Sequence, residues 1–237
     1  MHSFVSQIYI SDSNLPLSDY LKHCIAQIKL GYSNFEHTIY DKDSLREFIK
    51  NHFDSQVVNA YDKLNPYAYK ADLGRYCLLY EKGGWYFDIS VRLINPVVLE
   101  SDVKSLAFRD MQYASGTSFA CSNSILFSKK NDPVFEAAIH MVIKNCDQEY
   151  YGISTLCPTG PNLLGRAFAM QGADSQRIFG EQILLTPYHY LRNPAFVLAN
   201  GTIFALKKQT SDGGLAMFGA HGTNDYNEFY STRRVYK

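Results

Sequence analysis

Residues 66–91 read PYAYKADLGRYCLLYEKGGWYFDISV and predict a helix that leads through a glycine turn into a strand. Asn65 is a favourable N-cap and proline is favourable at the first helical position, so the helix is expected to begin there and to run to Lys82. The pair Gly83-Gly84 ends it, and the β-prone run 85–91 follows as a buried strand.

Two charged residues lie on the apolar side of this predicted helix. At 3.6 residues per turn, Asp72 falls between Tyr76 and Leu79 on the apolar face, and Arg75 lies one step further round. One interpretation is a partly buried ion pair that supports the fold. The other is that both side chains face a polar ligand at the edge of a sheet.

The predicted strand carries a second polar set, because side chains alternate along a strand. Tyr86, Asp88 and Ser90 share one face. A carboxylate at the end of a central strand is suited to a diphosphate and its divalent metal. The turn ending at Gly84 would let a ligand approach the backbone. Asp88 could equally be a turn residue at the end of the strand.

The flanking sequence alternates strands and helices. Residues 6–10 and 35–40 read as strands, 17–28 as a helix, and Ser44 to Glu47 has the form of a capping box that opens another. This pattern predicts an α/β fold with a Rossmann-like, mostly parallel sheet whose ligand lies beyond the carboxyl ends of the strands. Later elements are expected at 124–128, 133–145, 159–168 and in a hairpin over 196–207 with its turn at Asn200-Gly201.

Composition narrows the class of protein. The 237 residues are 46% hydrophobic, which is typical of a packed globular chain, and their 23 basic side chains balance 23 acidic ones, so no global field attracts nucleic acid. Five cysteines without a C-x-x-C pair are expected to be reduced, buried thiols. Without a leader or a long apolar run, we expect a cytoplasmic protein with one domain over 1–237.

The segment from Tyr69 to Asp88 resembles the signature of the glycosyltransferases with a DxD sugar-binding segment (family 32-like). This family contains capsular and lipopolysaccharide sugar transferases, with the clostridial glucosylating toxins as distant relatives. Its Asp-x-x-Arg-Tyr helix leads into Gly-Gly-x-Tyr-x-Asp-x-Asp. The weaker matches outside this segment are Gln7 to Ile10, Asn123 with Ser128 and Pro133, and Thr159-Gly160-Pro161.

The resemblance implies a GT-A fold and transfer from a nucleotide sugar, with a UDP-sugar preferred. It implies that Asp72 and Arg75 hydrogen-bond the hydroxyls of the donor sugar and that Asp88 meets the ribose or the metal-bound diphosphate. These three are the candidate catalytic residues. The further substrate-binding candidates are Tyr9 near the base, Gly84, Tyr86, Asn123, Thr159, Gly160 and Pro161.

One residue departs from the family pattern. Ser90 stands where the family has its second acidic residue, so the motif has one formal charge instead of two. The expected metal set for Mn²⁺ or Mg²⁺ is Asp88, Ser90 and His221, with Asn224 and Asp225 as competitors for the last place. Three outcomes are open: the metal is retained, cationic side chains replace it, or catalysis is lost.

The leading functional prediction is a retaining glycosyltransferase that adds a hexose or N-acetylhexosamine to a surface polysaccharide. Residues 1–95 would bind the nucleotide sugar, and residues 96–237 would form the acceptor side and a closing segment. A soluble or lipid-linked glycan would be the acceptor, with peripheral contact at the cytoplasmic face of the inner membrane. The alternatives are an effector that glycosylates protein and a catalytically silent module that binds nucleotide sugar or glycan.

The sequence nominates no catalytic nucleophile. By family analogy we expect front-side departure, in which the leaving phosphate deprotonates the acceptor hydroxyl. Double displacement through a carboxylate stays open, but Asp102 and Asp110 are too loosely placed to nominate. A Rossmann dehydrogenase is excluded because the first strand-to-helix turn has no glycine triplet.

Overall fold

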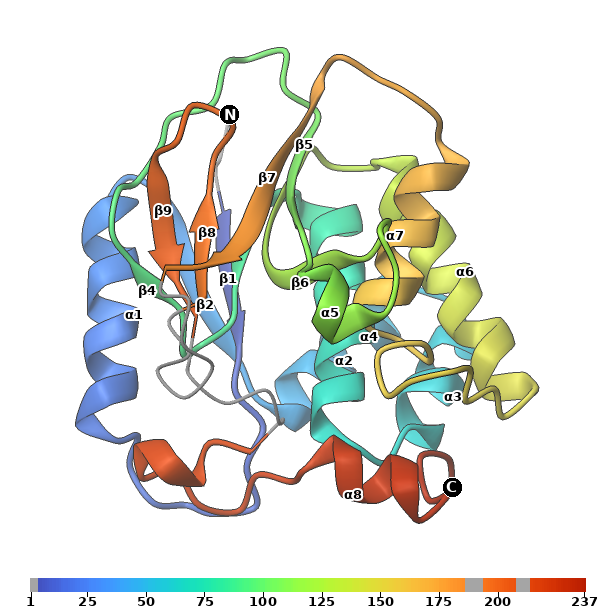
Figure 1. Ribbon diagram of the computed structural model, residues 1–237. Coiled ribbons are helices and arrows are strands. Elements are labelled where there is room, and N and C mark those ends of the chain that lie inside the picture. Colours follow the sequence, from blue (N-terminus) through green and yellow to red (C-terminus); the bar gives the residue numbers. More distant parts are fainter. Residues whose placement is uncertain (1–3, 186–193, 208–213) are drawn as a thin grey trace.

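The computed structural model describes residues 4–185, 194–207 and 214–237 and has a mixed α/β architecture (Figure 1). Its strands in these ranges are β1 (Phe4–Ile8), β2 (Glu36–Tyr40), β3 (Gly84–Phe87), β4 (Arg92–Leu93), β5 (Ser105–Arg109), β6 (Cys121–Ser128), β7 (Arg177–Leu184), β8 (Pro194–Val197) and β9 (Ile203–Leu206). Its helices are α1 (Asp19–Gly31), α2 (Lys42–His52), α3 (Ser55–Lys63), α4 (Tyr67–Lys82), α5 (Gln112–Ser115), α6 (Pro133–Asp147), α7 (Pro161–Met170) and α8 (Tyr226–Ser231), with a 3₁₀ turn at Ala216–Phe218.

Among the described residues the strands form one sheet in the order β2-β1-β3-β6-β5-β7-β8-β9-β4. The expected halves 1–95 and 96–237 both contribute strands to it. The prediction of a mostly parallel sheet needs correction, because the parallel pairs are limited to β1 with β2, β1 with β3, and β5 with β7.

The remaining strand pairs among the described residues are antiparallel. β6 lies antiparallel to both β3 and β5, and β8 pairs antiparallel with β7 and β9. A parallel connection needs a crossover of a dozen or more residues, whereas the hairpin between β8 and β9 turns within a few. The hairpin turn lies at Asn200-Gly201 as predicted, but only Gly201, at φ 83°, has the positive φ that a type I′ turn requires at both positions.

Helices cover both faces of the sheet. Figure 1 shows α1 on one side and α3, α4, α6 and α7 on the other. The larger apolar core lies between the sheet and this second group, while α1 packs through Leu21, Ile25 and Ile28 on the opposite face. The sheet is therefore buried on both sides along its centre.

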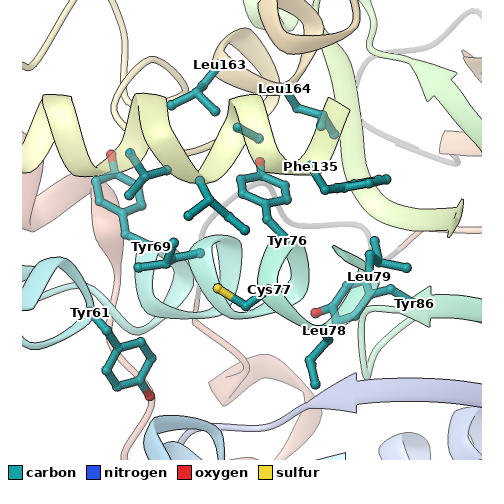
Figure 2. Close-up of a cluster of buried hydrophobic side chains, with 14 of the residues drawn as sticks. Tyr61, Tyr69, Tyr76, Cys77, Leu78, Leu79, Tyr86, Phe135, Leu163 and Leu164 are labelled. Atoms are coloured by element: carbon teal, nitrogen blue, oxygen red, sulfur yellow. The ribbon is translucent and has the colours of Figure 1, made fainter. Parts of the chain in front are cut away.

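Helix α4 is the central helix of the larger core. Tyr69, Leu73 and Tyr76 are almost fully buried, and Figure 2 shows both tyrosines pointing from α4 toward α6. The Tyr76 ring lies 6.2 Å from the Phe135 ring of α6, measured between centroids. The tyrosine-rich composition thus serves packing here, with each hydroxyl bonded to a backbone carbonyl.

The helix starts differ from the sequence predictions by a few residues. α2 begins at Lys42 with Asp41 as its N-cap, and Ser44 is the third-position partner of that capping box. α4 begins at Tyr67, and the Asn65 side chain donates to the carbonyl of Arg234 instead of capping the helix. Asn65 is thus used for tertiary contact with the C-terminal segment.

All five cysteines are buried free thiols, which confirms that prediction. In the part of the chain that the structure describes, none of the helices has both the length and the apolar character that crossing a membrane requires.

The first prediction concerns Gly84, where φ is 84° and a Cβ would lie 2.3 Å from the carbonyl oxygen of Phe4. Gly84→Ala combines left-handed strain with a backbone clash against β1, so we expect a loss of about 3 kcal/mol or more in the free energy of unfolding. Gly201 has a similar φ of 83° but nothing within 4 Å of a Cβ. Gly201→Ala should therefore cost only the strain, about 1 kcal/mol. Urea unfolding of both variants makes the comparison, and equal losses would contradict the clash.

Candidate functional site

A cavity of about 500 Å³ lies at one edge of the sheet. The pairings make β1, β3, β5 and β7 run in the same direction, so their carboxyl ends meet at this edge together with the amino-terminal end of β6. This is the place where an open α/β sheet binds its ligand. The sequence-predicted site residues that line the cavity are Tyr9, Asp72, Arg75, Tyr86, Asp88, Ser90, Asn123, Gly160 and Pro161.

Helix α4 and strand β3 bring three charged groups together. Asp72 and Arg75 lie one helical turn apart, and Arg75 Nη2 is 3.3 Å from Asp72 Oδ1. Arg75 Nη1 is 3.0 Å from Oδ1 of Asp88, which follows β3. The predicted ion pair is therefore present, and its members also border the cavity.

Arg75 is 4% exposed and its donors are used within the protein. Its Nε donates to the carbonyl of Ala71 at 3.0 Å, and Nη1 donates also to the carbonyl of Asn123. The guanidinium lies 4.5 Å from the centroid of the Tyr86 ring, whose hydroxyl donates to Asp88 Oδ1 at 2.9 Å. Arg75 thus acts here as a fixed counter-ion with limited freedom to move.

Asp72 is held by two further donors. Asn123 Nδ2 donates to Oδ1 at 2.6 Å, and Thr159 Oγ1 donates to Oδ2 at 2.6 Å. Burial raises the pKa of Asp72 to about 6, against the opposing effects of Arg75 and these hydrogen bonds. Thr159 does not line the cavity and acts on the site through Asp72. Local sequence patterns cannot predict contacts across separations of 51 and 87 residues.

Asp88 and Ser90 are the residues to test against a divalent cation. The Asp88 side chain is 31% exposed, and its hydrogen bonds with the described residues are all to Oδ1. Ser90 lines the cavity beside it, and its carbonyl accepts from Tyr20 at 3.3 Å. Among the described residues there is no group of three metal-ligating side chains. Mg²⁺ commonly takes one or two carboxylates plus substrate phosphates and water, so this pair fits a cation whose other ligands come from a diphosphate.

The C-terminal segment borders the cavity without His221. Its imidazole is exposed and is not among the lining residues, which goes against the prediction that it completes the metal set. The backbone explains this position: the carbonyls of His221 and Gly222 accept from Ser11 and Asp12, which fixes the turn against the N-terminal loop. Thr223, Tyr226 and Asn227 line the cavity instead.

The competitors for that metal position have structural roles. Asn224 Oδ1 accepts from the Tyr67 backbone N–H at 2.8 Å, at the start of α4. Asp225 is the N-cap of α8 and accepts from Asn227 N. Neither residue lines the cavity.

Gly84 also lies outside the cavity, contrary to the prediction of substrate contact. It begins β3, whereas Asp88 follows the carboxyl end of that strand. Its missing side chain allows close approach of β1, since a Cβ would meet the backbone of Phe4. The glycine turn thus serves strand packing.

Several polar residues of the cavity wall lie outside the predicted site, among them Asp110, Gln182 and Lys207. Asp110 follows β5, Lys207 follows β9, and Gln182 lies two residues before the end of β7. Each interrupts or ends a β-prone run with a polar side chain, which is a signal too common to identify a site by itself. Sheet order is needed to bring them to one edge.

The pKa of Asp72 yields a prediction on stability. Its folded pKa of about 6 exceeds the ordinary value of 3.8, so the folded protein holds one more proton than the unfolded chain between about pH 4 and 6. The Asp72 contribution to stability is therefore fully present below pH 4 and falls by up to about 1.4 kcal/mol for each pH unit up to 6. Urea unfolding of wild type and Asp72→Asn at pH 4, 5, 6 and 7 isolates this slope. Parallel pH profiles for the two proteins would contradict it.

Comparisons with known proteins point to the same region. Residues 18–109 match the family described as "Glycosyltransferase sugar-binding region containing DXD motif". This match includes Asp72, Arg75 and Asp88. An uncharacterized glycosyltransferase of Acanthamoeba polyphaga mimivirus is 30% identical over 135 residues, which are 56% of this chain and 52% of that protein. The chain therefore spans about half the length of that relative.

A solved structure named "PaToxG Glycosyltransferase" superposes with a TM-score of 0.55. It is 16% identical, and the match covers 72% of this chain and 70% of that chain. A likeness at this identity establishes the fold. The resemblance inferred from the sequence is confirmed for this region: residues 18–109 are similar to the sugar-binding region of glycosyltransferases, and the fold is that of a solved glycosyltransferase.

Proposed function

We propose that this chain is a glycosyltransferase that moves a hexose or N-acetylhexosamine from a nucleotide sugar, preferably a UDP-sugar, to a glycan hydroxyl. The observation that carries the proposal is the cluster of Asp72, Arg75 and Asp88 in the wall of a 500 Å³ cavity. The cluster lies inside the region that matches the sugar-binding family. The cavity volume is in the range of small-molecule sites.

The order of the strands supports an assignment of donor parts to residues. Tyr9 follows β1 and would contact the base, while Asp88 and Ser90 follow β3 and would meet the diphosphate. Asp72 and Asn123 would meet the transferred sugar next to it. Asp72 has both oxygens engaged, but a carboxylate has about four lone-pair positions and can accept from a sugar hydroxyl as well.

The charges of the cluster suit an anionic donor. Arg75 lies between two carboxylates and offsets part of their negative field, which lowers the repulsion of a diphosphate. A divalent cation held by Asp88 and Ser90 would supply Lewis-acid stabilisation of the leaving diphosphate. Tyr86 donates to the same Asp88 oxygen as Arg75, which fixes that carboxylate with Oδ2 available.

The mechanism that we propose is retention by front-side departure. Asp72 is a poor nucleophile, since both of its oxygens already accept hydrogen bonds and it contacts Arg75. The acceptor hydroxyl would then lose its proton to a phosphate oxygen of the leaving group. This proposal follows the family resemblance stated from the sequence.

For the acceptor we propose a surface-polysaccharide glycan, soluble or lipid-linked, with the enzyme in the cytoplasm. A second candidate function is favoured by Ser90: a silent module that binds a nucleotide sugar without turning it over, because one acidic ligand is missing. The two candidate functions differ in one measurable property: the transferase consumes the nucleotide-sugar donor, whereas the silent module only binds it.

The deciding experiment measures nucleoside-diphosphate release from a panel of UDP- and GDP-sugars, with Mn²⁺ and with EDTA. Release from one donor that is lost with EDTA supports the metal-assisted transferase. Binding of donors in calorimetry with no release under any condition, with p-nitrophenyl glycosides as acceptors, would favour the silent module. No binding of any nucleotide or sugar nucleotide would overturn both.

Asp88→Asn tests the site. The change keeps the size of the side chain and removes the charge that faces the cation and diphosphate, so we expect a fall in turnover of at least tenfold. The amide oxygen can still accept from Arg75 and Tyr86, and Asp72 remains as the counter-ion of Arg75, so the variant should stay folded. Near-normal turnover in a folded variant would contradict the role of Asp88.

Ser90→Asp restores the second acidic residue of the motif. We expect the Mn²⁺ concentration for half-maximal activity to fall at least threefold, because a carboxylate attracts a dication more strongly than a hydroxyl does. Ser90 is 4% exposed, so the added charge should also lower the Tm in EDTA. Unchanged Mn²⁺ dependence would show that this position does not contact the cation.

A further inference from the structure

Gln182 combines three properties that no contact among the described residues explains. It lies on β7, it is 4% exposed, and it lines the cavity. Its Oε1 is buried and has no hydrogen-bond partner among the described residues. A buried amide oxygen without a partner is unfavourable, because it loses its bonds to water and gains none in return.

Gln182 has apolar neighbours on its own face of β7 and on β8, while Asp110 and Lys207 also line the cavity. Alternation places it on the same face of β7 as Ile178 and Leu184, and Phe196 is its partner on β8. Met111 and Pro194 line the neighbouring wall of the cavity. A methionine or leucine here would bury apolar surface without leaving a polar atom unpaired. The unpartnered amide oxygen is therefore suited to a polar group that enters the cavity.

The position of Gln182 along the edge identifies which part of the ligand it can reach. β6 and β5 separate β7 from β3, so the Asp88 and Gln182 strands are three strand spacings apart, about 14 Å. The base at Tyr9 and the diphosphate at Asp88 lie toward the other end of the row. Gln182 is thus placed for groups beyond the diphosphate.

We propose that Gln182 hydrogen-bonds a sugar hydroxyl in this cavity and thereby selects the sugar. An amide offers both a donor and an acceptor, which matches a hydroxyl group, and its terminal torsion rotates easily to present either atom. The hydroxyl belongs to the transferred sugar or to the acceptor sugar, and the arms of the experiment separate these sources. This inference rests on the proposed function.

The test compares Gln182→Met with Ser122→Ala. Ser122 is a matched control, since its hydroxyl is also buried without a partner among the described residues, but it does not line the cavity. Both changes remove an unpaired polar atom, so the Tm of each variant should equal or exceed that of wild type. A Gln182→Met protein that loses more than a few degrees of Tm or fails to fold would show a structural role and overturn the proposal.

The ligand arms measure Kd for UDP and for UDP-glucose, UDP-galactose and their N-acetylamino forms by calorimetry, and UDP release with p-nitrophenyl hexosides as acceptors. We expect Gln182→Met to leave Kd for UDP within twofold of wild type. Contact with the transferred sugar raises Kd for the preferred UDP-sugar at least tenfold. Contact with the acceptor leaves that Kd unchanged and raises KM for the p-nitrophenyl hexoside at least tenfold. Ser122→Ala should change none of these.

The failures are distinguishable. If wild-type protein binds the UDP-sugar and Gln182→Met has the same Kd and KM, the role of Gln182 is overturned. The proposed function then stays intact. If wild-type protein binds none of these nucleotides, the proposed function falls and this inference falls with it.

Discussion

The rest of the site depends on the ion pairs and hydrogen bonds that the Arg75 guanidinium makes. This guanidinium links α4 to β3 through Asp88 and to β6 through the carbonyl of Asn123, while its own helix supplies Asp72. Removing one member of such a buried set leaves another charge unpaired, which costs far more than an exposed pair would. The carboxylates at the cavity are therefore positioned by the same interaction that joins the central helix to the sheet.

Helix α4 extends this constraint to the loop before α7. The hydroxyls of Tyr69 and Tyr76 donate to the carbonyls of Thr155 and Thr159, and Figure 2 shows both rings on the α6 side of the helix. The Thr159 hydroxyl then closes on Asp72. One face of a single helix thus packs the core, fixes a distant loop and orients a carboxylate. A change in the packing of α4 would therefore alter the geometry of the cavity even when no cavity-lining residue is substituted.

The sequence was informative where chemistry and periodicity are local. Asp72, Arg75 and Asp88 lie in one short segment, and helix and strand periods place them correctly at the carboxyl edge. Gly84 does not line the cavity as the sequence predicted. A glycine before a strand can allow either a neighbouring strand or a ligand to approach the backbone, and only the position of β1 decides between these roles. His221 and Gln182 depend on tertiary contacts: one is turned outward by backbone bonds to the N-terminal loop, and the other reaches the cavity through sheet order. The antiparallel strands likewise follow from loop paths that residue periodicity does not encode.

Ser90 affects both the electrostatics of the cavity wall and those of the proposed donor complex. The cluster already contains two carboxylates for one guanidinium, and a third carboxylate at this buried position would be uncompensated whenever no cation is present. Serine avoids that cost, and in return the protein alone attracts a cation weakly. In the proposed function, cation binding would then depend on oxygens that arrive with a diphosphate. On this reasoning the residue that departs from the family motif favours joint binding of metal and donor over a resident metal.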